Sequence, residues 1–380
     1  MMATLKHALF LALASLCAAS TAYAQALQPP QVAGRAFVVT DLSSGQVLAA
    51  EKADERVEPA SLTKLMTAYL VFSALREGRI ELHQQVQVSE RAWRAPGSRT
   101  FLELGKAVSV ETLLHGMVVQ SGNDASIALA EMLAGSEALF AQLMNREAAR
   151  LGMTQSRFAN ATGLPDAQHY SSARDLALLG TALIRDFPQE YTRYYPMKEF
   201  RHNEITQMNR NRLLWLDPSV DGVKTGFTQA AGYCLIASSE RGGRRLLTVL
   251  LGADSEAARA RESQKLLNWG YQFFDGVRLY EPGQAVRRVD VWKGAEDAVK
   301  AGFERGLVVT VPRGEAKRLA AELLTHPPVF APVQKGDKVG VLRVALDGRP
   351  LGEYPVVALE GVPQAGVFGR AWDTLRLWFR

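Results

Sequence analysis

Ser61 and Lys64, three residues apart, are the first side chains in the sequence that could carry out a reaction together. They lie in the segment PASLTK, directly ahead of an apolar stretch with helical periodicity. On a helix this spacing places both side chains on one face, so that the amine can reach the hydroxyl. A lysine whose pKa is lowered can remove the proton of a serine and convert its hydroxyl into a nucleophile. Alone, the pair also fits a helix start followed by a surface lysine.

Two further segments carry polar side chains at spacings that suit catalysis. Ser121 and Asn123, in QSGND, form a polar Ser-x-Asn loop between two apolar helical segments, although a helix cap would have the same pattern. Lys224, Thr225 and Gly226 lie in VDGVKTGFT, which reads as a strand. A glycine at this point lets the backbone of a ligand lie against the strand edge, while an edge strand protected by a lysine is the structural alternative.

The spacing of apolar residues predicts the helices and strands that must position these groups. Apolar residues at helical spacing predict a helix after Pro59, and further helices and strands are expected along the chain to residue 274. Ser172 and Asp175 are predicted to form a capping box. The expected helices cover 125–133, 138–151, 173–185 and 256–274, and the expected strands cover 36–40, 47–50, 223–227, 232–238 and 245–251. This order of elements predicts an α/β unit.

Beyond Tyr280 the sequence becomes β-rich. Residues 286–292, 307–311 and 338–344 alternate or are β-branched, and Asp347-Gly348 predicts a hairpin turn closed by 353–358. We therefore expect a small second domain rich in strands.

Both ends of the chain carry signals for location. Residues 1–24 combine Lys6, a short apolar run and a small-x-small site ending at Ala24, which predicts a cleaved secretory signal. Cleavage there removes Cys17 and leaves Cys234 as the only cysteine, so no internal disulfide is expected. The formal net charge is +5, and acidic and basic residues are interleaved without a basic block, which argues against nucleic acid as a partner.

The C-terminal segment 364–380 is predicted to be an amphipathic helix. Aromatic and aliphatic residues share one arc of the helical wheel, whereas arginines occupy most of the other. Such a helix suits an anionic membrane interface, although packing on the β-rich domain is the alternative. The apolar arc contains Val367, Phe368, Ala371, Trp372, Leu375, Trp378 and Phe379.

Taken together, S-x-x-K, S-x-N and K-T-G in this order resemble the signature of serine penicillin-recognising enzymes. The segments SLTKLMTAY, QSGNDAS, YSSARDLALL, QMNRNRLLW, VDGVKTGFT and ESQKLLNWGYQFF are similar to those of low-molecular-mass penicillin-binding proteins of the 5/6 type, which are D-alanyl-D-alanine carboxypeptidases. Gly122 favours this family over β-lactamases, which usually have Asp there. Phe227 departs from the pattern, because polar residues often follow the K-T-G glycine.

The resemblance implies a fold and a set of roles. The fold would be a penicillin-binding/β-lactamase-like transpeptidase domain of the α/β (α+β) class, then a β-rich domain and an amphipathic helix. Ser61 would attack the bond between the terminal D-alanines of a peptidoglycan pentapeptide stem, with Lys64 as base and Ser121 passing a proton to the leaving amine. The substrate would be held by Asn123, Lys224, Thr225, Gly226, Phe227, Thr228 and Arg259. Within this set, Ser61 and Phe227 would supply the backbone N–H groups of an oxyanion hole, and Thr225, Thr228 and Arg259 would bind the terminal carboxylate.

From these observations we predict four segments: a signal peptide at 1–24, a carboxypeptidase domain at 25–280, a β-rich domain at 281–363 and a membrane-anchoring helix at 364–380. β-Lactams would be covalent inhibitors, the protein would act at the periplasmic face of the inner membrane, and no metal or other cofactor is expected. Two rivals remain. A class A β-lactamase needs Glu-x-x-x-Asn well ahead of K-T-G, and the only formal match, Glu199 with Asn203, is too near it. A penicillin-binding sensor that stays acylated would keep all three motifs.

Overall fold

The computed structural model describes residues 28–325, 328–366 and 373 of the 380-residue chain. The chain divides into two compact units, one ending at Tyr271 and the other beginning at Gln272. All ten predicted site residues belong to the first unit. The predicted signal at 1–24 and most of the predicted helix at 364–380 lie outside the described residues.

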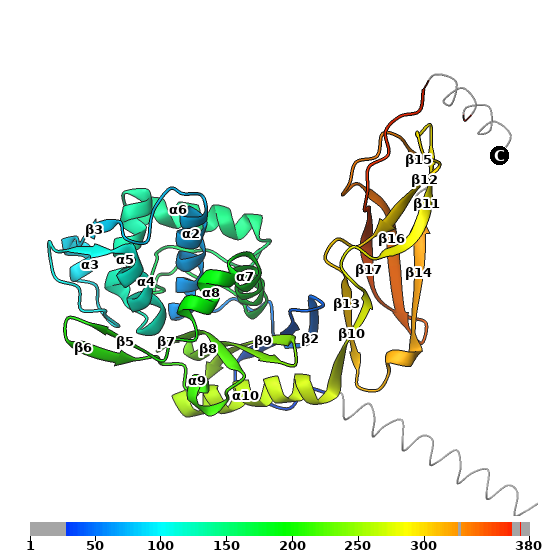
Figure 1. The fold of residues 1–380 in the computed structure, drawn as a ribbon. Coiled ribbons are helices and arrows are strands. Elements are labelled where there is room, and N and C mark those ends of the chain that lie inside the picture. Colours follow the sequence, from blue (N-terminus) through cyan, green and yellow to red (C-terminus); the bar gives the residue numbers. More distant parts are fainter. Residues whose placement is uncertain (1–27, 326–327, 367–372, 374–380) are drawn as a thin grey trace, which may run out of the picture. The chain divides into compact units, whose positions relative to one another are not determined.

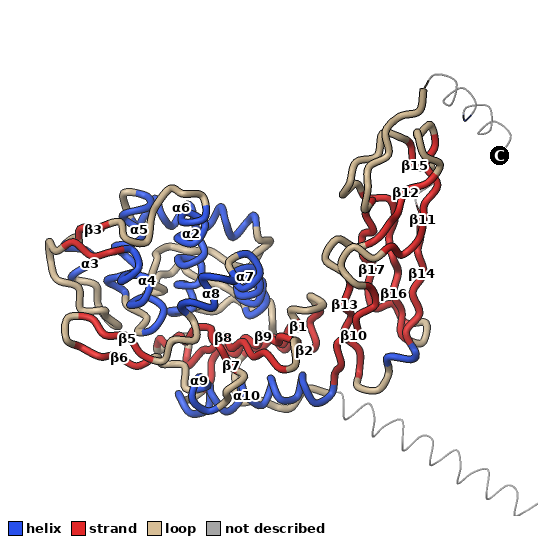
Figure 2. Tube along the Cα trace, in the orientation of Figure 1, coloured by secondary structure: helices blue, strands red, loops and turns tan. Residues whose placement is uncertain are grey.

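An antiparallel sheet of five strands is the framework of the first unit (Figures 1 and 2). The strand order β2-β1-β9-β8-β7 joins the first two strands of the chain to the last three of the unit and leaves β7, which carries K-T-G, at one edge. The strands are β1 (Ala36–Asp41), β2 (Gln46–Glu51), β7 (Val220–Thr228), β8 (Gly232–Arg241) and β9 (Arg244–Ala253).

Helices cover both faces of this sheet (Figure 2). On one face Val38, Ile236 and Val249 of the strands join the main apolar core. On the other face Leu235 and Leu246 pack in a smaller cluster with residues of α9 and α10. The first face carries α2 (Lys64–Arg76), α4 (Val110–Val119), α5 (Asn123–Ala134), α6 (Glu137–Arg150), α7 (Ala173–Asp186) and α8 (Pro188–Tyr194), and the second carries α9 (Leu213–Leu216) and α10 (Glu256–Phe273).

Helix α2 is the central helix of the unit. Its sequence, KLMTAYLVFSALR, has no charged residue between Lys64 and Arg76, and a helix that is apolar on nearly all sides is stable only when it is surrounded by protein. Lys64, at the first position of α2, is therefore carried into the interior, where it is 1% exposed. A 3₁₀ turn, η1 (Ala60–Thr63), precedes α2 and contains Ser61.

Short elements complete the first unit at the side of the central helices. The hairpin of β5 and β6 was not expected from the sequence, because its two four-residue strands are mostly exposed and carry no apolar alternation. These elements are β3 (Gln85–Gln87), α3 (Glu90–Trp93), β4 (Ala107–Ser109), β5 (Glu199–His202) and β6 (Ile205–Met208).

The predicted helices and strands of the first unit are all present, with ends shifted by a few residues. The capping box at α7 is only half formed. The Ser172 hydroxyl accepts a hydrogen bond from the backbone N–H of Asp175 at 3.2 Å, as expected. The Asp175 carboxylate instead accepts from the backbone N–H of Gln155 and the hydroxyl of Ser156, both at 2.7 Å, so it fastens a neighbouring loop.

The second unit is built almost entirely of strands. A six-stranded sheet has the order β14-β16-β17-β12-β11-β15, and β10 pairs with β13. The predicted hairpin turn is present: Asp347 and Gly348 both have positive φ, which the two-residue turn between β16 and β17 requires. The elements are β10 (Phe274–Tyr280), β11 (Ala285–Trp292), β12 (Ala298–Gly302), β13 (Leu307–Pro312), η2 (Ala316–Arg318), β14 (Leu319–Thr325), β15 (Val329–Phe330), β16 (Lys338–Leu346) and β17 (Arg349–Ala358).

The boundary between the units lies earlier than residue 280. Strand β10 (Phe274–Tyr280) pairs with β13 of the second unit, and Val277 packs against that unit's core. The sequence could not show this, because the partner strand lies more than twenty-five residues further along the chain.

No single helix within 28–325 and 328–366 is long and apolar enough to cross a membrane. Only α5 and α6 taken together, bent by 83° at their junction, meet the criteria of length and composition.

Candidate active site

The turn that carries Ser61 is shaped by close backbone packing. Ala60 has φ of +48°, and its carbonyl lies so near Gly163 that a Cβ on Gly163 would be 1.7 Å from the oxygen. Only glycine fits at that position. This contact brings the carbonyl of Thr162 to the amine of Lys64, whose Nζ is 2.6 Å from the Thr162 oxygen and 3.0 Å from the Ser61 Oγ. The predicted serine–lysine pair is therefore formed.

The pKa of Lys64 is lowered to about 7. Burial is the main cause, because the charged amine loses its hydration, and the nearby positive charge of Arg210 adds to the effect. Asp124 and Glu137 oppose it. A lysine with this pKa is neutral in a large fraction of molecules at neutral pH, so it can accept the serine proton.

The Ser-x-Asn loop is held by side chains of the neighbouring segment. The Asp124 carboxylate accepts hydrogen bonds from the backbone N–H groups of Thr100, at 2.8 Å, and Leu102, at 3.2 Å. A Cβ at position 122 would lie 2.1 Å from the Thr100 Oγ1, so the S-G-N form of the motif fits here and a larger residue does not. Ser121 has φ of +65°, and its buried Oγ has no hydrogen-bond partner in the part of the chain that the structure describes.

Asn123 is fixed to the same segment. Its Nδ2 donates to the carbonyl of Pro96 at 2.6 Å, and its backbone N–H donates to that of Ser98 at 2.7 Å. The hydrogen bonds of the described residues include none between Asn123 and Lys64.

Strand β7 runs directly beside the nucleophile turn. A Cβ on Gly226 would lie 3.2 Å from both the Ala60 Cβ and the Pro59 carbonyl oxygen, so glycine permits this approach. Lys224 is 4% exposed, and its Nζ donates to the carbonyl of Thr225 at 3.1 Å. Burial, Lys64, Arg210 and Arg259 all lower the pKa of Lys224.

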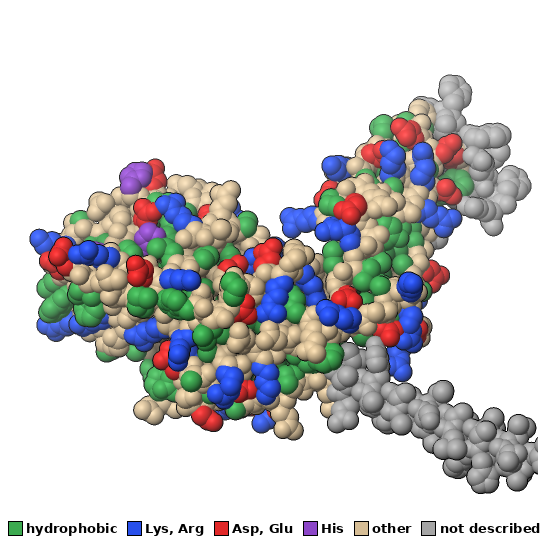
Figure 3. Space-filling view, turned by 60° about the horizontal axis from the view of Figure 1, so that its bottom comes forward, with side chains coloured by type: hydrophobic (Ala, Val, Ile, Leu, Met, Phe, Trp, Pro, Cys, Tyr) green, Lys and Arg blue, Asp and Glu red, His purple; other side chains and the backbone are tan. Residues whose placement is uncertain are grey.

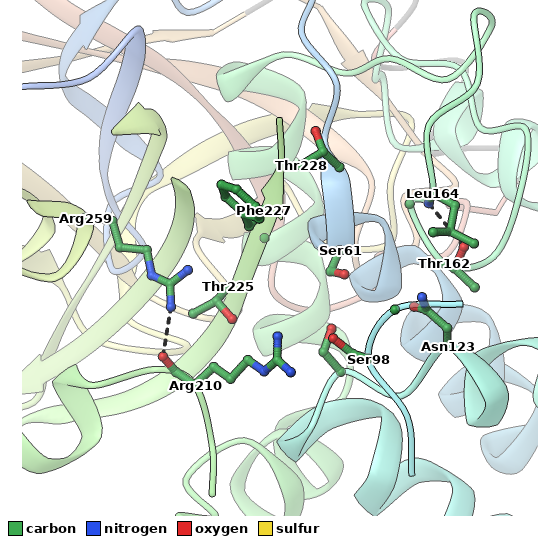
Figure 4. Close-up of a pocket in the computed structure, with 14 residues that line it drawn as sticks. Ser61, Ser98, Asn123, Thr162, Leu164, Arg210, Thr225, Phe227, Thr228 and Arg259 are labelled. Carbon is green, nitrogen blue, oxygen red and sulfur yellow. Dashed lines mark hydrogen bonds between the residues drawn. The ribbon is translucent and has the colours of Figure 1, made fainter. Parts of the chain in front are cut away.

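These three segments surround one cavity of about 320 Å³ (Figure 4). Eight of the ten predicted site residues line it, and the two lysines are buried beside it. The eight are Ser61, Ser121, Asn123, Thr225, Gly226, Phe227, Thr228 and Arg259. Sequence reasoning missed six further lining residues, namely Gly97, Ser98, Thr162, Gly163, Leu164 and Arg210.

Two arginines lie at one side of the cavity, beside Thr225 (Figure 4). The Arg259 guanidinium is 5% exposed and donates to the carbonyl of Arg210 at 3.0 Å and to Glu256 at 3.1 Å. The Arg210 side chain is exposed at the cavity, and the ion pairs of the described residues include none for it. Arg210 lies in QMNRNRLLW. The resemblance of this segment to penicillin-binding proteins was the only feature of the sequence that pointed to Arg210 as a site residue.

Thr228 lines the cavity, but its hydroxyl proton is used elsewhere. Its Oγ1 donates to the Glu58 carboxylate at 2.8 Å and accepts from the backbone N–H of Ala231 at 2.9 Å. The neighbouring Phe227 is 47% exposed and packs against Tyr233, with ring centroids 4.4 Å apart.

The cavity is positive. The guanidinium groups of Arg210 and Arg259 line it, whereas its lining residues include no Asp or Glu. Elsewhere on the surface, Lys and Arg are interspersed with Asp and Glu (Figure 3), often as ion pairs such as Arg174 with Asp54. An anionic ligand is therefore favoured at this cavity.

Three observations concern alternative chemistries: the Glu-x-x-x-Asn pair of a β-lactamase, a buried histidine and possible metal ligands. Glu199 lies in β5, and Asn203 donates from the following turn to the carbonyl of Phe101, so neither lines the cavity. His169 is buried behind the nucleophile turn, 2.8 Å from the Thr63 hydroxyl, and burial lowers its pKa to about 4. Among the described residues, no group of three or more His, Cys, Asp or Glu could hold a metal ion.

The fold and this site define a serine enzyme of the penicillin-recognising class. The chain belongs to the D-alanyl-D-alanine carboxypeptidase family, peptidase family S11, whose family model matches residues 23–255. Residues 274–364 match the C-terminal domain of penicillin-binding protein 5, which agrees with a second unit that begins before residue 280.

The relatives and solved structures described here cover between 64% and 95% of the chain. The sequence is 44% identical to the D-alanyl-D-alanine carboxypeptidase DacC of Escherichia coli over 95% of this chain and 92% of that protein, and 40% identical to DacA over 92% and 89%. The crystal structure of penicillin-binding protein 5 from Haemophilus influenzae superposes with a TM-score of 0.83 at 38% identity, covering 89% of this chain and 99% of that one. Penicillin-binding protein D2 of Listeria monocytogenes, in its ampicillin-bound form, gives 0.59 at 32% identity, covering 64% and 100%.

Proposed function

We propose that this protein removes the terminal D-alanine from peptidoglycan pentapeptide stems through an acyl-enzyme on Ser61, and that β-lactams acylate the same serine. One observation carries the proposal: the amine of Lys64, with its pKa lowered to about 7, lies 3.0 Å from the Ser61 hydroxyl at the cavity where the other motifs meet. Family membership supports the same activity.

The proposed reaction begins when neutral Lys64 takes the Ser61 proton. The serine oxygen then bonds to the carbonyl carbon between the two D-alanines. The backbone N–H groups of Ser61 and Phe227 stabilise the oxyanion, a contribution that is typically about 3 kcal/mol for one donor.

Ser121 completes proton transfer to the leaving group. Its buried hydroxyl, which has no partner among the described residues, is free to carry the proton from Lys64 to the D-alanine nitrogen as the C–N bond breaks. Water then attacks the acyl-enzyme and gives its proton to Lys64. The shortened peptide leaves with a new carboxylate, and the Ser61 hydroxyl is restored.

The terminal carboxylate of the substrate defines the enzyme as a carboxypeptidase. Thr225 and Arg259 are assigned to this group, and the exposed guanidinium of Arg210 adds positive charge on the same side of the cavity. Buried Lys224 of the same strand is assigned to the local positive potential, and Asn123 to the substrate amide. The Thr228 hydroxyl can donate to the substrate carboxylate only if it first breaks its hydrogen bond to Glu58.

We further propose that residues 1–24 are a cleaved export signal and that 364–380 attach the enzyme to the periplasmic face of the inner membrane. The composition of both segments supports this location, which also suits a peptidoglycan substrate.

The β-lactamase alternative lacks support at the site, because the cavity lining has no carboxylate to activate a deacylating water. A sensor that remains acylated would have the same geometry. Purified protein should therefore be given a soluble pentapeptide ending in D-Ala-D-Ala. We expect continuous release of D-alanine from the wild type and none from Ser61→Ala. A single stoichiometric burst, or release that survives in folded Ser61→Ala, would contradict the proposal.

A further inference from the structure

One hydrogen bond joins the chain segments that carry the two proposed oxyanion donors. The Thr228 hydroxyl donates to the Glu58 carboxylate at 2.8 Å, across 170 positions of sequence. Glu58 lies three residues before Ser61, and Thr228 directly follows Phe227 at the end of β7. In Figure 4, Thr228, Phe227 and Ser61 lie together at one side of the cavity.

The packing at this junction is close but, within the described residues, contains no hydrogen bond of its own. The turn and the strand meet where Gly226 faces the Ala60 Cβ, the Leu62 side chain and the Pro59 carbonyl oxygen, which are van der Waals contacts. A hydrogen bond to a carboxylate does have a preferred direction and length, and it is stronger than one between neutral groups. The Glu58–Thr228 bond is therefore the contact that can fix the register of the two segments.

The chemistry of both partners fits a positioning role. The Thr228 hydroxyl has a single proton and gives it to Glu58, while its oxygen accepts from the N–H of Ala231, which also fixes the turn after β7. Glu58 forms no ion pair with any residue in the described parts of the chain. The causes of the lowered Lys64 pKa do not include Glu58, so its influence on catalysis would not pass through the base.

We propose that Glu58 is a positioning residue: by accepting the hydrogen bond of Thr228 it aligns the backbone N–H of Phe227 with that of Ser61, and so sets the rate of acylation. This inference rests on the proposed function of Ser61, and it assigns Thr228 to the scaffold of the site.

The test compares full-length Glu58→Ala and Glu58→Gln with the wild type. Glu58→Ala should slow acylation by a fluorescent penicillin roughly ten- to a hundredfold, the scale expected when reacting groups are displaced by up to about 1 Å. Binding of the penicillin before acylation should change less than about twofold, and the pH at half-maximal rate should not move. Glu58→Gln should restore most of the rate, because its amide oxygen can still accept the Thr228 proton.

A double-mutant cycle identifies the partner. Thr228→Val removes the hydroxyl with little change in shape, and Glu58→Ala combined with Thr228→Val should be no slower than either single variant. Glu55→Ala is the matched control, since Glu55 lies three residues earlier and, within the described parts of the chain, pairs only with exposed Arg35. It should acylate at the wild-type rate.

Three results would overturn the inference: a wild-type rate in folded Glu58→Ala or folded Thr228→Val, additive losses in the double variant, or a Glu58→Gln variant as slow as Glu58→Ala. If Glu58→Ala does not fold, Thr228→Val and Glu58→Gln still decide the matter. Failure of the proposed function would look different, because Ser61→Ala would then still be labelled.

Discussion

The amine of Lys64 and the carbonyl oxygen of Thr162 lie 2.6 Å apart. A carbonyl can only accept, so this contact fixes one N–H of the amine whether or not the group is charged. When Lys64 is neutral, its lone pair is free to accept the proton of the Ser61 hydroxyl, 3.0 Å away. The short contact thus orients the base, and burial sets the pH range in which it can work.

Acylation should therefore depend on pH through Lys64. Its pKa in the folded enzyme is about 7, far below the ordinary value of 10.5. Below that pKa the amine carries a proton and cannot accept another, and above it the amine is neutral. The second-order rate of penicillin acylation should rise about tenfold per pH unit at low pH and level off above about pH 8. A rate that stays flat from pH 5 to pH 10 in folded enzyme would remove Lys64 as the base.

Replacing Arg210 should move this profile. Its positive charge contributes to the low pKa of Lys64, so Arg210→Gln should raise that pKa and shift the half-maximal rate to higher pH. The shift is measured from the midpoint, which separates it from any loss of substrate affinity. Arg212→Gln, an exposed change two residues away, is the control and should leave the midpoint unchanged. Equal midpoints in wild type and Arg210→Gln would exclude this electrostatic role.

Adding a side chain at Gly122 should disrupt the Ser-x-Asn loop. The new Cβ would meet the Thr100 Oγ1 at 2.1 Å, and Thr100 cannot retreat easily because its side chain also presses against Gly116. We expect Gly122→Ala to slow acylation at least tenfold and to lower the melting temperature by several degrees, since overpacking costs about 1–3 kcal/mol. Gly361→Ala, where the nearest atom to the new Cβ is 3.4 Å away, controls for the substitution itself. Unchanged activity in Gly122→Ala would show that the loop can open without cost.

Gly226→Ala should test the approach of β7 to the nucleophile turn. Its Cβ would lie 3.2 Å from the Ala60 Cβ and from the Pro59 carbonyl oxygen, so strand and turn must separate by a few tenths of an ångström. We expect penicillin acylation to fall roughly tenfold or more with little loss of stability, because the displaced groups are the proposed oxyanion donors. Thermal unfolding and acylation kinetics, measured on the same sample, would show whether acylation slows while the melting temperature stays close to that of the wild type.

How far the sequence could predict this site depends on how strongly chemistry restricts each residue. Ser61, Lys64 and the K-T-G residues could be predicted because few side chains can form an activated nucleophile at those spacings. Arg210 and Leu164 could not, since they reach the cavity from loops whose course depends on the packing of the whole unit. The Glu58–Thr228 bond spans 170 positions, and no periodic pattern reports such a distance.

The same distinction applies to the fold. Helices such as α7 were predicted closely, because an apolar stripe and an N-cap are local signals. The assignment of β10 to the second unit depends on a remote partner strand, which no local pattern shows.

The last prediction concerns the C-terminal segment, which should attach the protein to membranes without taking part in catalysis. Burying five or six large apolar side chains could contribute several kcal/mol at roughly 25 cal/mol per Å², much of it offset by ordering the segment. Its three arginines could add about 1 kcal/mol each near anionic lipid. Truncation after Gly366 is the sharpest change, because it keeps the backbone bond from Ala365 to Lys293 that closes the β-rich unit.

The truncated protein should appear in the soluble periplasmic fraction and still release D-alanine from a soluble pentapeptide at the wild-type rate, since all proposed catalytic residues lie between Ser61 and Arg259. Full-length Trp372→Glu/Trp378→Glu should behave in the same way. High salt should release only part of the full-length protein, because salt screens the arginines but not the apolar contact. The rival is a helix packed on the β-rich unit, for which the contact of the Asp373 carboxylate with the backbone N–H of Lys293 at 2.6 Å is a starting point. If truncation lowers the melting temperature of that unit while the protein still sediments with inner membranes, the segment is structural and another surface binds the membrane.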